Sequence, residues 1–350
     1  MMMSDIGEKG FLRHLLPSLK VDSAFINGFG HDASVLDIGL PDIAIAFKID
    51  RAAKPIAAYN GWAGFESWGR LAVTANISDI LAVGATPKGF MLSISVPGNW
   101  QTHQTEAVIR GADEECKRIG VVFLGGDTKE AEEAHVVGAA IGVVNKAKIV
   151  NRRSAVSGDA ILLAGDLGGF AGAYTLLKNI KSENVLHNEY LSHPRCALRE
   201  SVYLRENFNI SSAVDLSDGL WEGLSLLTGE NLGVQLEIDA LPFHDFAREA
   251  AEVFGATISN FAFTVGDWGI LYTLPVDEAH KAISLAPEGV KLSLVGLVTD
   301  TKGIVIHSDI SSSEYKLQQN LRNEHFVQRM ENERGYFDQL LLVDFLRITE

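Results

Sequence analysis

Apolar and polar residues follow two different periods along the chain, and each period predicts a kind of element. Alternating apolar residues, as in "DIAIAFKID" (42–50), predict strands, whereas apolar residues three and four apart predict helices. In the first half, strands and helices succeed one another in the order of an α/β domain, which we place at residues 1–148. The predicted strands are 33–39, 42–50, 89–97, 120–126 and 135–144, and the predicted helices are 8–20, 66–83 and 101–119.

The second half again alternates predicted strands and helices. It follows a polar segment, "NRRSAVSGD" (151–159), which we call the polar joint. A buried strand is predicted in "AILLAGDLGG", and further strands and helices follow it to residue 308. We therefore predict a second domain at 149–308. From about residue 310 the chain becomes charge-rich with helical spacing, which predicts a helical C-terminal extension at 309–350.

Charge and composition exclude several classes of function. The chain has 350 residues and a formal net charge of −15, so a surface for nucleic acid or for an anionic membrane is not expected. The longest apolar run, "VVGAAIGVV", is far too short to span a bilayer, and "MMMSDIGEKG" has no apolar signal core. Two cysteines in no motif indicate a reducing compartment, and we expect a cytoplasmic protein.

Common catalytic motifs are absent or out of context. "GFGHDA" (28–33) matches the dinucleotide-binding glycine pattern, but a strand rather than a helix is predicted after it. The sequence contains no phosphate loop of the G-x-x-x-x-G-K-[ST] type, no G-x-S-x-G elbow and no H-E-x-x-H pair. The chemistry must therefore come from other residues.

One carboxylate stands in an unusually apolar helix, "ANISDILAVGATP" (75–87). Apolar residues surround Asp79 on almost every side of this helix, which predicts that the helix is buried. A buried carboxylate is costly unless it is paired or bound to a metal. Two interpretations remain open: Asp79 is a metal ligand, or it forms an ion pair with a neighbouring arginine such as Arg70.

Other aspartates share this setting at the edges of apolar elements. Each has an ordinary interpretation, as a turn residue, a helix cap or the end of a strand. Taken together, they favour a site for hard divalent cations such as Mg²⁺, which bind carboxylates and bridge them to nucleotide phosphates. The set consists of Asp32, Asp50, Asp79, Asp127, Asp215 and Asp218.

Five motifs occur in the order found in thiamine-monophosphate kinase, which the chain resembles from about residue 8 to 305. They are "GFGHDASVLDIG", "NISDILAVGATP", "FLGGDT", "NRRSAVSGDAILLAGDLG" and "VDLSDGLWEGL". That family belongs to the superfamily of aminoimidazole ribonucleotide synthetase, selenophosphate synthetase and the hydrogenase-maturation dehydratase. The resemblance implies a two-domain α/β (α+β) fold: an N-terminal sheet domain that forms the core of a homodimer, and a C-terminal sheet flanked by helices. It also implies ATP and Mg²⁺ as cofactors.

The resemblance assigns roles residue by residue. It implies that the six aspartates hold Mg²⁺, with Ser217 beside Asp215, and that Asp127, Asp218 and Arg152 act in catalysis. The nucleotide phosphates would be lined by Gly125, Gly126, Asp127, Thr128 and Arg152. "VGDWGILYTLP" resembles a stretch near the acceptor substrate, which assigns Asp267 and Trp268 to that substrate; plain core packing is the alternative for Trp268.

The sequence also departs from the family pattern on the acceptor side. His31 stands where the family has an aspartate, and Gly266 and Gly269 replace two glutamates of the acceptor motif. These changes suggest an acceptor less anionic than thiamine monophosphate, unless Lys48, Arg51 or Lys54 replaces metal charge. His31 and Ser217 join Asp267 and Trp268 as candidate substrate residues, and His31 or Asp267 is a candidate general base for an alcohol acceptor.

The sequence therefore predicts an ATP- and Mg²⁺-dependent phosphotransferase that acts on a small cytoplasmic acceptor, with no nucleic-acid or membrane partner. Two alternatives remain. One is an ATP-dependent ligase that forms an amide or amidine, as in the purine-synthesis relatives, and the other is a catalytically weakened nucleotide-binding protein.

Overall fold

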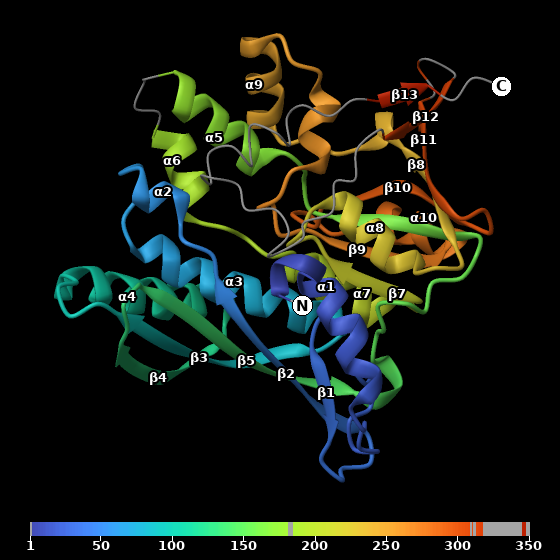
Figure 1. The fold of residues 1–350 in the computed structure, drawn as a ribbon. Coiled ribbons are helices and arrows are strands. Elements are labelled where there is room, and N and C mark those ends of the chain that lie inside the picture. The colour runs from blue at the N-terminus through green and yellow to red at the C-terminus, as the bar shows by residue number, and fades with distance from the viewer. Residues whose placement is uncertain (1, 181–184, 309, 311–312, 318–344, 348–350) are drawn as a thin grey trace.

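Two β-sheets with helices between and around them make up the chain in the computed structural model (Figure 1). The structure describes residues 2–180, 185–308, 310, 313–317 and 345–347. The first sheet uses strands up to residue 145 and the second uses strands from residue 159 onward, so the two sheets divide at the polar joint. The domain boundaries at 148 and 308 stay a prediction.

The first sheet has five strands in the order β1-β2-β5-β3-β4. Its neighbours pair antiparallel except β3 and β4, which are parallel and are connected by a helix. Small or apolar residues on one face alternate with larger residues on the other, as the sequence pattern required. The strands are β1 (Ser34–Asp37), β2 (Ile43–Ala52), β3 (Thr86–Val96), β4 (Val122–Glu130) and β5 (His135–Asn145).

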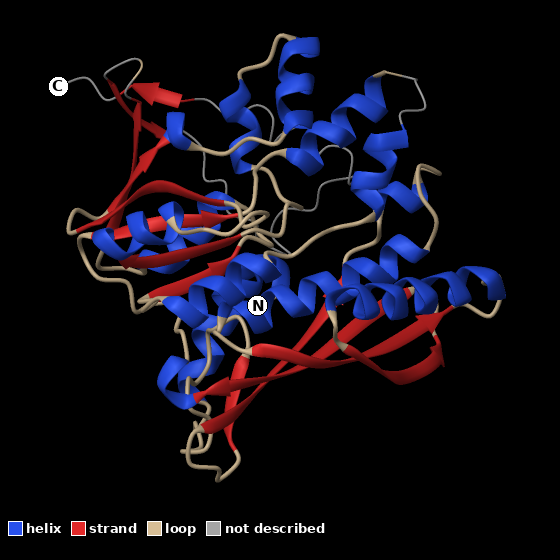
Figure 2. Cartoon of the chain, turned by 180° about the vertical axis from the view of Figure 1, so that it is seen from behind, coloured by secondary structure: helices blue, strands red, loops and turns tan. Residues whose placement is uncertain are grey.

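Two long helices, α3 (Glu66–Ala82) and α4 (Thr102–Ile119), cover one face of this sheet (Figure 2). They pack closely because glycines stand at their contact: a Cβ on Gly69 would lie 1.9 Å from the carbonyl oxygen of Val108. A Cβ on Gly111 would similarly lie 2.0 Å from the carbonyl oxygen of Glu66. This contact tolerates no larger side chain, and it brings α3 deep into the molecule.

The opposite face of the first sheet carries no helix or strand in the described part of the chain (Figures 1 and 2). Large apolar side chains lie exposed on it, and Ile49 at the middle of β2 is 71% exposed. We call this surface the open face; its exposed members are Leu36, Ile43, Phe47, Ile49 and Met91. Monomeric proteins rarely leave so continuous an apolar surface in water.

The second sheet has eight strands in the order β13-β12-β11-β8-β10-β6-β9-β7. Strands β6 and β9, near the edge strand β7, are buried on both faces, which explains their continuous apolar sequences. The strands are β6 (Asp159–Ala164), β7 (Ser212–Asp215), β8 (Gly233–Glu237), β9 (Ile270–Pro275), β10 (Leu292–Thr299), β11 (Gly303–Ser308), β12 (Ser313–Leu317) and β13 (Phe345–Arg347). The remaining α-helices are α1 (Met3–Leu15), α2 (Ile56–Tyr59), α5 (Gly169–Asn179), α6 (Val185–Ser192), α7 (Leu198–Asn207), α8 (Leu220–Thr228), α9 (Asp245–Phe254) and α10 (Val276–Ser284).

Helix α3 lies between the two sheets and joins their cores. It packs on β2, β5 and β3 of the first sheet and on β7 of the second, and it also contacts α6 and α7. One continuous apolar cluster accordingly includes Ile77 and Ile80 of α3 together with Leu162 of β6 and Ile270 of β9. Side chains from both halves of the chain can therefore meet beside α3.

The predicted strands and helices of residues 8–308 are confirmed, and so is the predicted class of mixed α/β fold with two sheets and flanking helices. The strand after "GFGHDA" is β1, so the dinucleotide-binding interpretation of that motif is wrong, as its context indicated. In the C-terminal extension, the helical prediction is wrong for 313–317 and 345–347, which are strands, and its other residues from 318 on lie outside the described residues. In the described part of the chain, no helix combines the length and hydropathy needed to cross a membrane.

Candidate functional site

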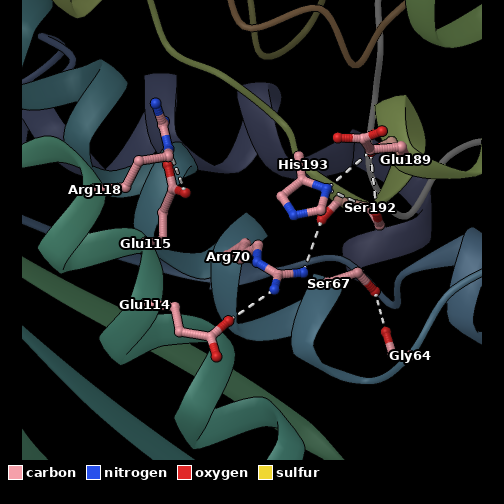
Figure 3. Close-up of polar contacts among 9 residues, drawn as sticks. All are labelled: Gly64, Ser67, Arg70, Glu114, Glu115, Arg118, Glu189, Ser192 and His193. Atoms are coloured by element: carbon pink, nitrogen blue, oxygen red, sulfur yellow. Dashed lines mark hydrogen bonds and ion pairs between the residues drawn. The ribbon is translucent and has the colours of Figure 1, made fainter. Parts of the chain in front are cut away.

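Asp79 lies in the last turn of α3 and is almost completely buried. Its Oδ2 forms an ion pair with Nζ of Lys48 on β2, at 3.0 Å. Arg70, the partner considered from the sequence, instead pairs with Glu114 of α4 at 2.8 Å and contacts the backbone oxygen of Ser192 at 3.5 Å (Figure 3). The ion-pair interpretation with Arg70 is therefore wrong, because α3 turns Arg70 and Asp79 toward different neighbours.

Asp79 is one of three buried carboxylates that converge on a single point. One oxygen from each of Asp32, Asp79 and Asp215 lies within 4.8 Å of the others, and each residue is at most 6% exposed. They come from three separate places in the fold: the loop before β1, helix α3 and the end of strand β7. We call this group the carboxylate triad. The packing of α3 between the two sheets creates it.

Two cations face the triad. Arg152, from the polar joint, pairs with Asp32 through Nη2 to Oδ1 and through Nε to Oδ2, the latter at 3.3 Å. Its backbone N–H donates to Nδ1 of His31 at 3.2 Å, so the loop before β1 is tied to the joint. Lys48 supplies the second cation beside Asp79.

Burial and mutual repulsion both raise the pKa values of two of the triad carboxylates. Burial, together with the charge of Asp215, raises the pKa of Asp79 well above its ordinary value. Burial and the charge of Asp32 likewise raise the pKa of Asp215 to about 7. Burial opposes the charge of Lys48, yet the carboxylates of Asp79 and Asp50 raise its pKa above the usual range. The carboxylates at the site therefore outnumber the two cations that face them.

One oxygen of the triad has no partner within the described structure. Oδ1 of Asp215 accepts a hydrogen bond from Oγ of Ser217 at 3.1 Å, whereas its buried Oδ2 has none. A buried carboxylate oxygen without a partner is costly, and oxygen donors at this spacing are those that Mg²⁺ prefers. The residues present fit a divalent cation.

Two further predicted ligands stand at the margin of the triad. Asp50 lies half-buried two residues after Lys48 on β2, so both side chains leave the same face of the strand. Asp218 lies half-buried in the turn between β7 and α8, three residues after Asp215. Neither belongs to the group whose oxygens converge within 4.8 Å.

The "GGDT" segment lies elsewhere, on β4 at the outer edge of the first sheet. Gly125 has φ +91°, and a Cβ on Gly126 would lie 1.7 Å from the backbone oxygen of Leu92, so both positions require glycine where β4 bulges against β3. Thr128 is exposed, and the side chain of Asp127 is 60% exposed with Lys129 Nζ 3.7 Å away. Within this chain the structure does not bring Asp127 to the triad.

Asp267 has a backbone role that the sequence did not reveal. Its carboxylate accepts hydrogen bonds from the N–H groups of Gly168 at 2.6 Å and Phe170 at 2.8 Å, at the start of α5. Burial raises its pKa to about 7, and the N–H of Phe170 and of Gly168 oppose that shift. Since both oxygens are engaged, Asp267 fits poorly as a general base.

Trp268 holds the one positive φ, +51°, among non-glycine residues of the described chain. The next residue, Gly269, accepts a hydrogen bond from the N–H of Leu216 at 2.9 Å, which places Trp268 next to the end of β7 that carries Asp215. Strained backbone of this kind often marks a functional position. Its half-buried side chain agrees with either a substrate role or core packing.

Lys48 is the residue that the predicted site set omitted, although the sequence offered it with Arg51 and Lys54 as a source of charge. The structure selects Lys48: Lys54 is directed to Glu133 at 3.5 Å, and Arg51 is exposed. Strand alternation was the available signal, because it directs Lys48 and Asp50 to one side of β2.

Comparisons with known proteins agree with the fold. Residues 30–144 match the family described as AIR synthase related protein, N-terminal domain. The chain is 28% identical over 244 residues to the thiamine-monophosphate kinase of Pyrococcus abyssi, covering 69% of this chain and 74% of that protein. It is 26% identical over 306 residues to the same enzyme of Rhodopirellula baltica, covering 85% and 91%.

A solved structure described as AaThiL complexed with AMPPCP and TMP superposes with a TM-score of 0.73 at 19% identity, covering 87% of this chain and 95% of that one. Residues 30–144 thus carry the sequence of an AIR synthase-related N-terminal domain, and the fold is that of the thiamine-monophosphate kinase-like proteins. The chain is a thiamine-monophosphate kinase-like enzyme, as the sequence predicted.

Proposed function

We propose that this chain is an ATP- and Mg²⁺-dependent phosphotransferase of the thiamine-monophosphate kinase type, acting on a small acceptor in the cytoplasm. The observation that carries the proposal is the carboxylate triad with its unpartnered Asp215 oxygen. The similarity to thiamine-monophosphate kinases over two thirds or more of the chain supports it.

The residues of the triad would hold the metal, with Asp50 and Asp218 at its margin. Mg²⁺ bound there supplies positive charge to the phosphate oxygens of ATP, which phosphoryl transfer requires. Asp32, Asp79 and Asp215 fix the position of that charge from three rigid elements. Arg152 and Lys48 add a guanidinium and an ammonium next to it.

The hydrogen bonds of the Asp267 carboxylate affect which kind of acceptor the site can use. A phosphate acceptor is ionised near neutral pH and needs no general base, whereas an alcohol acceptor often does. Because Asp267 binds backbone N–H groups with both oxygens, it is disfavoured as that base, and His31 is the other candidate. Lys48 and Arg152 also weaken the argument for a less anionic acceptor, since they supply charge beside the triad. Thiamine monophosphate is therefore the first acceptor to test.

An acceptor assay decides the function. We expect the purified protein with Mg²⁺ and ATP to phosphorylate thiamine monophosphate with kcat/KM on the order of 10⁴ M⁻¹s⁻¹ or more, an ordinary value for an enzyme. ADP, free phosphate and the phosphorylated product are measured separately. Release of phosphate with a new C–N bond on a supplied amine would identify a ligase instead, and tight ATP binding without turnover would identify a binding protein.

We also propose that two copies of the chain associate through the open face. This face carries exposed apolar side chains on β1, β2 and β3 of one sheet, and a second copy presents the same surface. Homodimer interfaces are more apolar than other interfaces, which suits the exposed residues. Strand β4, which carries Asp127, lies at the edge of the same sheet. The "GGDT" segment would therefore lie beside the proposed dimer interface.

Asp127 tests whether the "GGDT" segment serves the nucleotide. We expect Asp127→Asn to lower kcat by at least ~100-fold with little change in melting temperature, because its side chain is 60% exposed and its ion pair with the exposed Lys129 is long, at 3.7 Å. Steady-state kinetics and thermal unfolding measure both. Glu130→Gln, on the same exposed strand end, is the control. Near-normal activity in Asp127→Asn would show that the Asp127 carboxylate does not serve the nucleotide.

A further inference from the structure

Lys48 lies within the proposed metal site rather than at its edge. Its ammonium is 3.0 Å from Asp79 and is close enough to Asp50 and Asp215 for their charges to act on it. Its side chain is only 23% exposed, so water screens these interactions weakly. A lysine among carboxylates that are positioned for metal is an unusual component of such a site.

The charges at the site show what Lys48 does. Arg152 pairs with Asp32 and Lys48 pairs with Asp79, whereas Asp215 has no direct ion pair within the described residues. Two of three carboxylates are thus compensated by cations that belong to the chain itself. The unpartnered oxygen of Asp215 marks the remaining position for an external cation.

We propose that Lys48 is a built-in cation of the triad, which stays beside Asp79 when the site is loaded and takes the place of a divalent ion there. This inference rests on the proposed function and deepens it. An ammonium carries three N–H donors, of which the structure shows one directed to Asp79. The others are available to a phosphate oxygen, so Lys48 adds both charge and a hydrogen-bond donor that a chelator cannot remove.

Binding of Mn²⁺ alone tests the inference. Metal-free protein is titrated with Mn²⁺, and free Mn²⁺ is followed by electron paramagnetic resonance. Lys48→Met is expected to lower the apparent Kd for Mn²⁺ by ~10-fold or more. The substitution frees Asp79 to bind metal, and it makes the net charge of the site more negative. Its melting temperature in EDTA is expected to fall. Lys54→Met, which removes a lysine paired with Glu133, is the matched control and is expected to change neither.

An ion pair with only a structural role gives a different result. It would lower the melting temperature of Lys48→Met in EDTA without strengthening Mn²⁺ binding, and unchanged or weaker Mn²⁺ binding overturns the inference. Lys48→Gln, which keeps a hydrogen-bond donor for Asp79, gives the same reading if Lys48→Met does not fold. Failure of the proposed function is seen separately: no acceptor is phosphorylated, while the Mn²⁺ comparison still decides the role of Lys48.

Discussion

Replacing Asp215 by asparagine is expected to lower kcat for ATP-dependent phosphoryl transfer by about a thousandfold or more, while metal-free protein becomes slightly more stable. Asp215 is the triad carboxylate without a direct ion pair in the described structure, so its charge has the least compensation when metal is absent. Asparagine keeps the volume and the acceptor for Ser217, and it removes repulsion from Asp32 and Asp79. It also removes a carboxylate that would bind the metal, and the transition state needs the positive charge of that metal.

Kinetics with Mg²⁺-ATP and thermal unfolding in EDTA measure the two effects together. Asp159→Asn provides a matched control, since Asp159 is a buried carboxylate on β6 of the same sheet whose Oδ2 accepts a hydrogen bond from the N–H of Val156 at 3.1 Å. This control is expected to lose stability and keep activity within a few-fold. Loss of stability in Asp215→Asn, with activity retained, would show that the triad is a structural cluster.

A carboxylate at the middle of the open face is expected to separate the proposed dimer. Ile49 is 71% exposed on β2, and a second copy packed on this face would bury it. An unpaired charge in an apolar interface costs several kcal/mol, which corresponds to a rise in dimer Kd of about a thousandfold. Ile49→Asp is therefore expected to run as a monomer at micromolar concentration by size-exclusion chromatography with light scattering.

Val253→Asp is the control for the added charge. Val253 lies on α9, away from the first sheet, and is 50% exposed. This variant is expected to keep the mass of the wild-type protein. If wild type is itself a monomer, or if Ile49→Asp stays a dimer, the open face does not join two copies of the chain.

The sequence by itself determined the local elements and one central requirement. Its apolar periods located the strands and helices of residues 8–308, because alternation and helical spacing record which side of an element is buried. The apolar surroundings of Asp79 predicted a buried carboxylate that needs a partner, and the structure confirms the burial. The order of the aspartate motifs was also enough to indicate the superfamily.

Only the tertiary structure decided which of these residues meet. Lys48 is the partner of Asp79 because β2 and α3 pack on each other, and Asp215 joins them because β7 of the second sheet packs on the same helix. Asp127 falls outside the triad because β4 is the edge strand of its sheet, and Asp267 binds the start of α5 across nearly a hundred residues of sequence. A period along the chain specifies which way each side chain faces on its own element. Which distant side chain it then meets depends on strand order and helix packing, and these are set by the burial of the whole apolar surface rather than by any local pattern.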